Sequence, residues 1–133
     1  MIRLINKEDE LFKNITVGID QNIKVSIELM EKSGLKFIVI TDPNGMVLGV
    51  ISDGDIRRAL YNGFLINTPV AEVMSLEPIV VNVDVTKAQV RSIIDYHKIT
   101  FIPSVDDKGV LTGIWTSDFF HESPILENSF VIM

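Results

Sequence analysis

The chain has no cysteine among its 133 residues, which excludes a disulfide framework and a thiolate zinc site. It has only two histidines, His97 and His121, and no serine, histidine and acid at a spacing that would support nucleophilic catalysis. A Walker-type phosphate loop and a dinucleotide-binding fingerprint are also missing. We therefore expect no catalytic residue, no metal ion and no catalytic cofactor, and we expect that this segment is not an enzyme by itself.

Positive charge is scarce as well. Twelve Lys and Arg residues stand against 18 Asp and Glu, a net charge of −6, so nucleic acid is not an expected partner. No apolar run approaches the length that spans a bilayer, and the first ten residues are too polar for a signal peptide. With cysteine absent, these features favour a cytoplasmic location and no membrane partner.

Apolar residues make up 47% of the chain, enough for one compact domain with a core. Their spacing predicts an amphipathic helix over residues 22–33. The apolar runs 37–40 and 46–51 flank a turn-forming Asp-Pro-Asn-Gly sequence, which predicts a hairpin. A second helix is expected from residue 53 to about residue 60.

This pattern occurs twice. Residues 15–55 align without a gap with residues 79–119, and eight of 41 positions are identical. The identical pairs are Ile15/Ile79, Val17/Val81, Asp20/Asp84, Phe37/Phe101, Ile38/Ile102, Asp42/Asp106, Gly45/Gly109 and Gly49/Gly113. We therefore predict an α+β (mixed α/β) fold, in which two β-α-β-β-α units related by a pseudo-twofold axis pack through their sheets.

The first unit ends on a strand that runs into a helix through Ser52, Asp53 and Asp55. Ser52 or Asp53 is the expected N-cap. The first turn of a helix leaves backbone N–H groups free at a partly positive terminus, which predicts an anion-binding corner. Ser52 could donate to a phosphate and Asp55 could accept from a ribose diol. The alternative is that these three residues only cap and charge the helix.

The repeat, with Gly-apolar-apolar-Ser/Thr-x-x-Asp at the strand-to-helix junction, resembles the tandem cystathionine-β-synthase (CBS) domain pair, or Bateman module. The resemblance covers residues 14–120. It implies that an adenosine nucleotide such as AMP, ADP or ATP, or S-adenosylmethionine, binds between the repeats as a regulatory ligand. It also implies a homodimer. The alternative is a ligand-free dimerisation scaffold for an attached enzyme.

The resemblance implies roles for individual residues of the first cleft. Asp55 matches the aspartate that holds the ribose hydroxyls, and Ser52 matches the hydroxyl that meets the phosphate. Asp53, between them, is expected to line the same ligand site. Lys36 falls where the family often places a basic group facing phosphates. The second repeat would supply the opposite wall, through Val81, Val85, Ile99, Thr100, Ile102 and Pro103.

The second cleft departs from the family pattern. Thr116 keeps the hydroxyl, but Phe119 stands where the ribose aspartate is expected, and Asp118 is displaced by one position. One position turns a side chain by about 100 degrees around a helix. We therefore expect one competent site and a second, weaker site at Thr16, Thr116 and Asp118.

Residues 52–60 more specifically resemble the CBS pairs found in front of sugar-1-phosphate nucleotidyltransferases. The terminal Phe130-Val131-Ile132-Met133 resembles the first strand of such an enzyme. We expect residues 1–67 to form repeat 1 with an N-terminal lead-in, residues 68–122 to form repeat 2, and residues 123–133 to be a linker and the start of a truncated catalytic domain. The parent chain would then be a nucleotidyltransferase, with its catalytic domain as a partner in cis.

Overall fold

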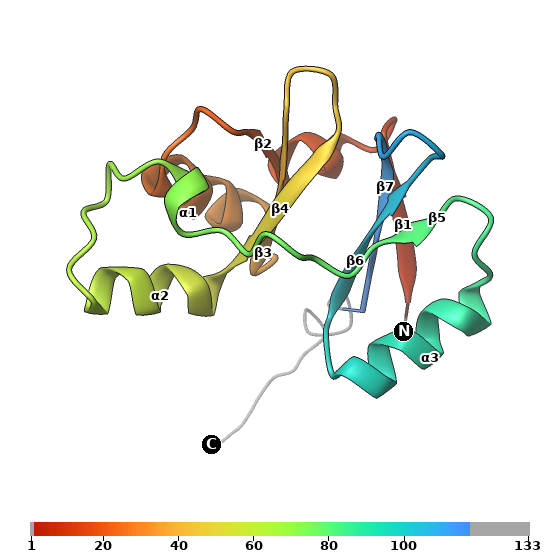
Figure 1. Ribbon diagram of the computed structural model, residues 1–133. Helices are drawn as coiled ribbons and strands as arrows, with labels where there is room; N and C mark the ends of the chain where they lie inside the picture. The colour runs from red at the N-terminus through yellow and green to blue at the C-terminus, as the bar shows by residue number, and fades with distance from the viewer. Residues whose placement is uncertain (1, 118–133) are drawn as a thin grey trace.

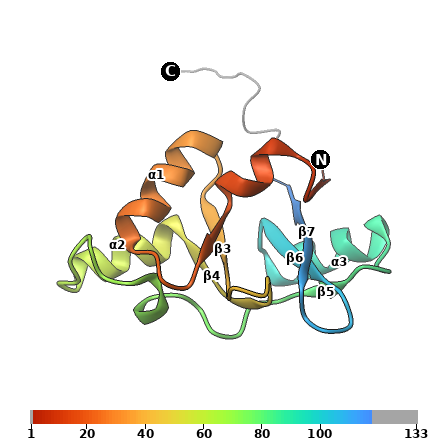
Figure 2. The ribbon, with the colours of Figure 1, turned by 90° about the horizontal axis from the view of Figure 1, so that it is seen from above.

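The computed structural model describes residues 2–117, which form two β-sheets with helices on their outer sides (Figures 1 and 2). The first sheet has the order β2 (Thr16–Gly18), β3 (Phe37–Thr41), β4 (Val47–Ser52). The second has the order β1 (Arg3–Asn6), β7 (Leu111–Thr116), β6 (Phe101–Val105), β5 (Val81–Asn82). The helices are α1 (Ile23–Ser33), α2 (Asp53–Tyr61) and α3 (Lys87–His97), with 3-10 turns η1 (Glu10–Asn14) and η2 (Val70–Glu72). The predicted α+β class is confirmed.

The predicted repeat is present in the described residues. Helix α3 begins and ends 64 residues after α1, and the hairpin β6–β7 lies 64 residues after β3–β4. In each unit the first strand pairs parallel with the second, which pairs antiparallel with the third. Both hairpins also carry an irregularity at the same place, Ile40/Thr41 in one and Ser104/Val105 in the other.

The two hairpin turns are built alike. Asp42 Oδ1 accepts backbone N–H bonds at 2.8 and 3.0 Å, and Asp106 Oδ1 accepts the equivalent two at the same distances. The two N–H donors, from Val110 and Lys108, hold the pKa of Asp106 below its usual 3.8. The glycine that closes each turn, Gly45 or Gly109, has φ of +87°, which favours a residue without Cβ.

Three apolar clusters hold the layers together. The first joins α1 and α2 to the outer face of the β2–β3–β4 sheet, and the third joins α3 to the outer face of the other sheet. The middle cluster lies between the sheets and includes Phe37 and Val39 from β3 with Leu111 and Ile114 from β7. The repeats therefore pack through their sheets, as the sequence predicted.

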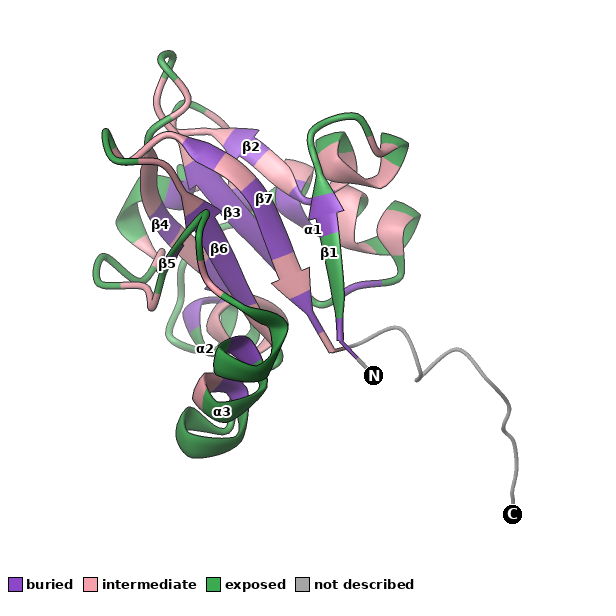
Figure 3. Ribbon diagram, turned by 90° about the vertical axis from the view of Figure 1, so that its right-hand side faces the viewer, coloured by how far each residue is buried: buried purple, intermediate pink, exposed green. Residues whose placement is uncertain are grey.

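Strand β1 was not predicted. It pairs antiparallel with β7, with Ile5 opposite Ile114, and so the N-terminal lead-in joins the sheet of the second repeat (Figure 3). Its apolar signal is short, because Leu4 is 40% exposed and only Ile5 of the strand is buried. The expected division at residues 67 and 122 stays a prediction, with β1 crossing from one unit to the other.

Several sequence-based expectations lie outside the described residues. These concern Asp118, Phe119, the helix expected after β7, and residues 123–133. Within residues 2–117, no helix is long and apolar enough to cross a membrane.

Candidate functional site

Ser52 is the N-cap of α2 and forms a capping box with Asp55. The Ser52 side chain Oγ accepts from the Asp55 backbone N–H at 3.1 Å, and Asp55 Oδ2 accepts from the Ser52 backbone N–H at 2.9 Å. Capping leaves both side chains with capacity for a ligand, because the serine keeps its O–H donor and a carboxylate has about four lone-pair sites. The capping and binding interpretations are therefore compatible.

A hollow of about 310 Å³ opens beside this helix start. The first repeat contributes Val50, Ser52 and Asp55 to its lining. The second repeat contributes Ile99, Phe101 and Pro103. It also contributes Ser75, Glu77, Pro78 and Ile79 from the connection between η2 and β5, which we call the η2–β5 linker. The structure thus brings together four of the predicted site residues, Ser52, Asp55, Ile99 and Pro103. We call this hollow the inter-repeat cleft.

The linker wall of the cleft was missed by the sequence reasoning. Ser75 and Val50 exchange backbone hydrogen bonds of 2.8 and 3.1 Å, which fixes the linker against the edge of β4. Position 49 must be glycine for this contact, because a Cβ there would lie 2.5 Å from the Ser75 carbonyl oxygen. The glycine was visible in the sequence as a repeat-identical residue, but its neighbour across the fold was not.

Lys36 and Asp53 lie elsewhere, contrary to expectation. They line a different hollow, of about 300 Å³, together with Glu31 and Met30 of α1. The Asp53 backbone N–H donates to the Lys36 carbonyl oxygen at 3.0 Å. Two positions along a helix turn a side chain by about 200 degrees, so Asp53 faces away from Asp55.

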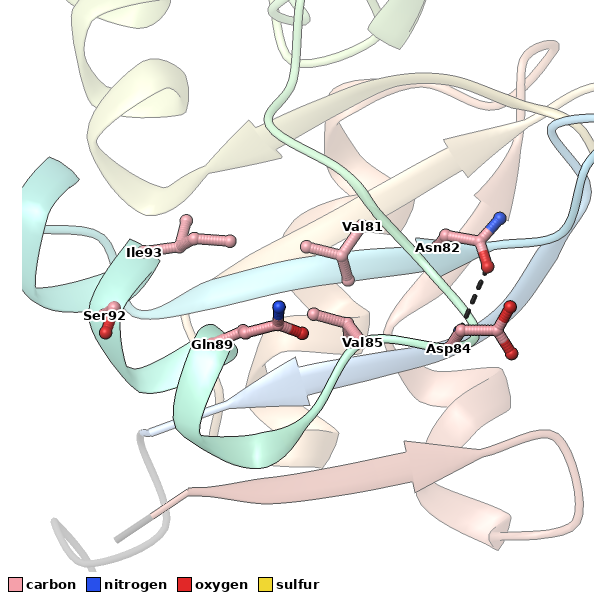
Figure 4. A pocket seen from close by; sticks show the side chains of 7 residues that line it. All are labelled: Val81, Asn82, Asp84, Val85, Gln89, Ser92 and Ile93. Carbon is pink, nitrogen blue, oxygen red and sulfur yellow. Dashed lines mark hydrogen bonds between the residues drawn. The ribbon is translucent and has the colours of Figure 1, made fainter.

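Val81 and Val85 also lie outside the inter-repeat cleft. They line a broad hollow of about 590 Å³ between β5 and α3, with Gln89 and Ile93 on its helical side (Figure 4). Thr100 does not line the cleft either. Its carbonyl oxygen accepts from Thr116 Oγ1 at 3.2 Å and so ties the start of β6 to the end of β7. Of the residues expected for the second-repeat wall, Ile99 and Pro103 line the cleft, and Phe101 joins them.

The described part of the symmetry-related second cleft is more buried than the first. Among the residues that match the cleft lining at a displacement of 64, the apolar Ile15, Leu35, Phe37, Val39 and Ile114 are at most 2% exposed. Ile5 of β1 belongs to the same buried cluster, with Leu11 and Phe12 of η1 packed against it. Apolar side chains from the N-terminal segment therefore pack against the buried residues that match the lining of the first cleft.

Two of the three residues predicted for the weaker site, Thr16 and Thr116, lie in the described part of the chain and have different surroundings. Thr116 is fully buried, while Thr16 Oγ1 donates to the Phe12 carbonyl oxygen at 3.1 Å and lines a separate hollow of about 100 Å³. Asp118 lies outside the described residues. Within residues 2–117, no three His, Cys, Asp or Glu side chains are grouped as a metal site.

The sequence and the structure both match known proteins. A family model for the CBS domain matches residues 10–62 and 70–118. The arabinose 5-phosphate isomerase GutQ of Escherichia coli K12 is 29% identical over 128 residues, covering 93% of this chain and 40% of the relative. The chain therefore spans well under half the length of this curated relative.

Solved structures give the same fold. The Vibrio cholerae protein AcuB, named for acetoin utilisation, matches with a TM-score of 0.74 and 30% identity, over 80% of this chain and 79% of that one. The CBS domain pair of protein MJ0100, in complex with 5′-methylthioadenosine and S-adenosyl-L-methionine, matches with a TM-score of 0.70 and 25% identity. That match covers 80% of this chain and 87% of the other.

Proposed function

The chain belongs to the CBS-domain family, and from this premise we propose that it is a regulatory module that senses an adenosine ligand in its inter-repeat cleft. The observation that carries the proposal is the meeting of Ser52 and Asp55 with the apolar Ile99, Phe101 and Pro103 across one hollow. Binding pockets for small molecules commonly combine an apolar lining with a few placed polar groups. The complex of MJ0100 with two adenosine derivatives supports the class of ligand.

Each wall of the cleft has a chemical task in this proposal. Phe101, Ile99 and Pro103 pack against the purine. Asp55 accepts hydrogen bonds from the ribose hydroxyls, and the Ser52 hydroxyl donates to the 5′ substituent. Lys36, Asp53, Val81, Val85 and Thr100 are not assigned to this ligand, because they lie outside the hollow.

Regulation by a bound ligand would follow from the fact that residues of both repeats line the cleft. The lining comes from both repeats, so a ligand that bridges these walls binds one arrangement of the repeats more tightly than another. Leu60, Tyr61, Leu65 and Ile66 expose 39% to 91% of their surface around the end of α2. This apolar patch supports the homodimer proposed from the family resemblance. A cytoplasmic location remains part of the proposal.

The attached enzyme is proposed as one that acts on a sugar phosphate. The isomerase relatives, of which this chain covers 40%, support an isomerase as the partner in cis. The resemblance of residues 52–60 supports a nucleotidyltransferase instead, and the comparisons add nothing in favour of that alternative. Sequencing the parent reading frame on both sides decides between them. A Gly-Gly-x-Gly-Thr-Arg-like run after Met133 would favour the nucleotidyltransferase, and a sugar isomerase domain would favour the other.

Isothermal titration with AMP, ADP, ATP and S-adenosylmethionine tests the sensing role. Two substitutions in the same helical turn form a matched pair. Asp55→Asn should weaken saturable binding at least tenfold, whereas Asp53→Asn, which faces the other hollow, should leave it unchanged. If none of the four ligands binds and the protein is a clean dimer by sedimentation, the ligand-free scaffold is the better description.

A further inference from the structure

The charge of the inter-repeat cleft is unusual for a nucleotide site. Among the described residues, the two ionisable ones that line it, Asp55 and Glu77, are both acidic, and no Lys or Arg lines it. Asp55 is compensated by Arg58, whose Nη2 donates to Asp55 Oδ1 at 2.7 Å. Within residues 2–117 no ion pair compensates Glu77. A polyphosphate in this cleft would meet an uncompensated carboxylate.

The helix start offers little to an anion. The Asp53 N–H already donates to the Lys36 carbonyl oxygen, and the Asp55 N–H already donates to Ser52 Oγ. The carboxylates of Asp53 and Asp55 further offset the partial positive charge of the helix terminus. The anion-binding corner expected from the sequence is therefore largely used by the protein itself.

The cation expected to face phosphates is not beside the cleft. Lys36 lines the hollow beside α1 instead. Among the described lining residues, the cleft therefore offers a triphosphate no cation to offset its charge.

We infer that the cleft selects adenosine derivatives that carry no phosphate, such as a neutral nucleoside, a thioether or a sulfonium cation, and that it discriminates against ATP. The inference rests on the proposed function and narrows its ligand class. Glu77 is the specificity-determining residue, because its carboxylate repels phosphate groups and attracts a cationic 5′ substituent. Ser52 then donates to a neutral acceptor or to the ribose ring rather than to a phosphate.

Isothermal titration at low ionic strength with adenosine, 5′-methylthioadenosine, AMP and ATP tests the inference. Adenosine and 5′-methylthioadenosine should bind at least tenfold more tightly than ATP, with AMP between them. Glu77→Gln should reduce the difference in binding affinity between adenosine and ATP, which we call the gap. Glu72→Gln removes an exposed acid of η2 that does not line the cleft, and it should leave the gap unchanged. Added salt should narrow the gap as well, because it screens the repulsion.

The possible results distinguish a failure of the proposed selectivity from a failure of the proposed sensing function. ATP binding as tightly as adenosine, with the loss in Asp55→Asn retained, would overturn the inference and leave the sensing role intact. An equal effect of Glu77→Gln and Glu72→Gln would also overturn it. Failure of all four ligands to bind would overturn both.

Discussion

Phe37 and Phe101, which are 64 residues apart and equivalent in the two repeats, stack with ring centroids 4.1 Å apart and ring planes 4° from parallel. A contact between equivalent residues lies on the pseudo-twofold axis. The two rings nevertheless differ in their surroundings, since Phe37 is 1% exposed in the core between the sheets while Phe101 lines the open cleft. The stack therefore marks a break in the symmetry of the fold, because one ring is enclosed between the sheets and the other lines the inter-repeat cleft.

Truncation of the two rings should therefore have unequal effects. Phe37→Ala is expected to lower the free energy of unfolding by about 3 to 5 kcal/mol, because it opens a cavity in a closed core. Phe101→Ala should cost less stability and should weaken ligand binding, because one side of the ring faces the cleft. Urea denaturation measures the first effect. Tyr96→Ala, with Tyr96 82% exposed, is the control and should change little. Equal losses for both phenylalanines would contradict the asymmetry.

Ser26 offers a way to stabilise the protein. Its Oγ is fully buried in α1 and has no hydrogen-bond partner among the described residues. The equivalent position in the second repeat is Val90, also fully buried. Ser26→Ala should raise the free energy of unfolding by about 1 kcal/mol, since it removes a buried, unsatisfied hydroxyl. Thermal denaturation reports the gain.

Ser33→Ala is the comparison for Ser26→Ala. The Ser33 Oγ accepts from the Leu35 backbone N–H at 3.0 Å, so its loss should destabilise by about 0.5 to 1.5 kcal/mol. Destabilisation by both substitutions would show that the Ser26 hydroxyl has a partner in solution.

Gly49 holds the linker wall in place. A Cβ at this position would lie 2.5 Å from the Ser75 carbonyl oxygen and 2.8 Å from Met74 Sδ. Gly49→Ala should push the linker away from β4, lower the free energy of unfolding by about 1 to 3 kcal/mol and weaken ligand binding. Chemical denaturation and titration on the same variant measure both effects.

Gly54→Ala is the matched change for Gly49→Ala. Gly54 lies in the first turn of α2, where a Cβ would lie 3.4 Å from the flexible end of Arg58 and 3.7 Å from Ser52 Oγ, both at ordinary contact distance. Alanine there should be neutral or should stabilise the helix by about 0.5 to 1 kcal/mol. If Gly54→Ala lowers the free energy of unfolding as much as Gly49→Ala, the loss at position 49 does not arise specifically from contact with the linker.

The contribution of Asp106 to the stability of its turn should depend on pH. Two backbone N–H donors lower its pKa in the folded state, which favours the charged carboxylate. Its contribution to stability is therefore present above the pKa of the unfolded chain and is lost as the pH falls through the lower folded value. The difference in free energy of unfolding between the wild type and Asp106→Asn should be larger at about pH 7 than at about pH 3. Urea titrations at both pH values measure it, and a difference that grows in acid would contradict the prediction.

Much of the fold was predictable because its signals are local. The helical spacing over residues 22–33, the turn sequence at Asp42–Gly45 and the capping serine at position 52 each depend on neighbours in the chain. The repeat adds a non-local inference, since two similar units predict a paired arrangement. Strand β1 was not predicted, because a four-residue strand with one buried side chain carries almost no hydrophobic pattern in the sequence.

The sequence alone determined the repeated unit, its pairing through the sheets, and the Ser52–Asp55 junction, because periodicity and capping act within a few residues. Only the tertiary structure decided which groups share the cleft with that junction. Lys36 and Val81 line other hollows, whereas Glu77 and Phe101 line the cleft. The physical reason is that the direction of a side chain depends on strand register and helix rotation, and the lining of a cleft depends on which distant segment packs beside it.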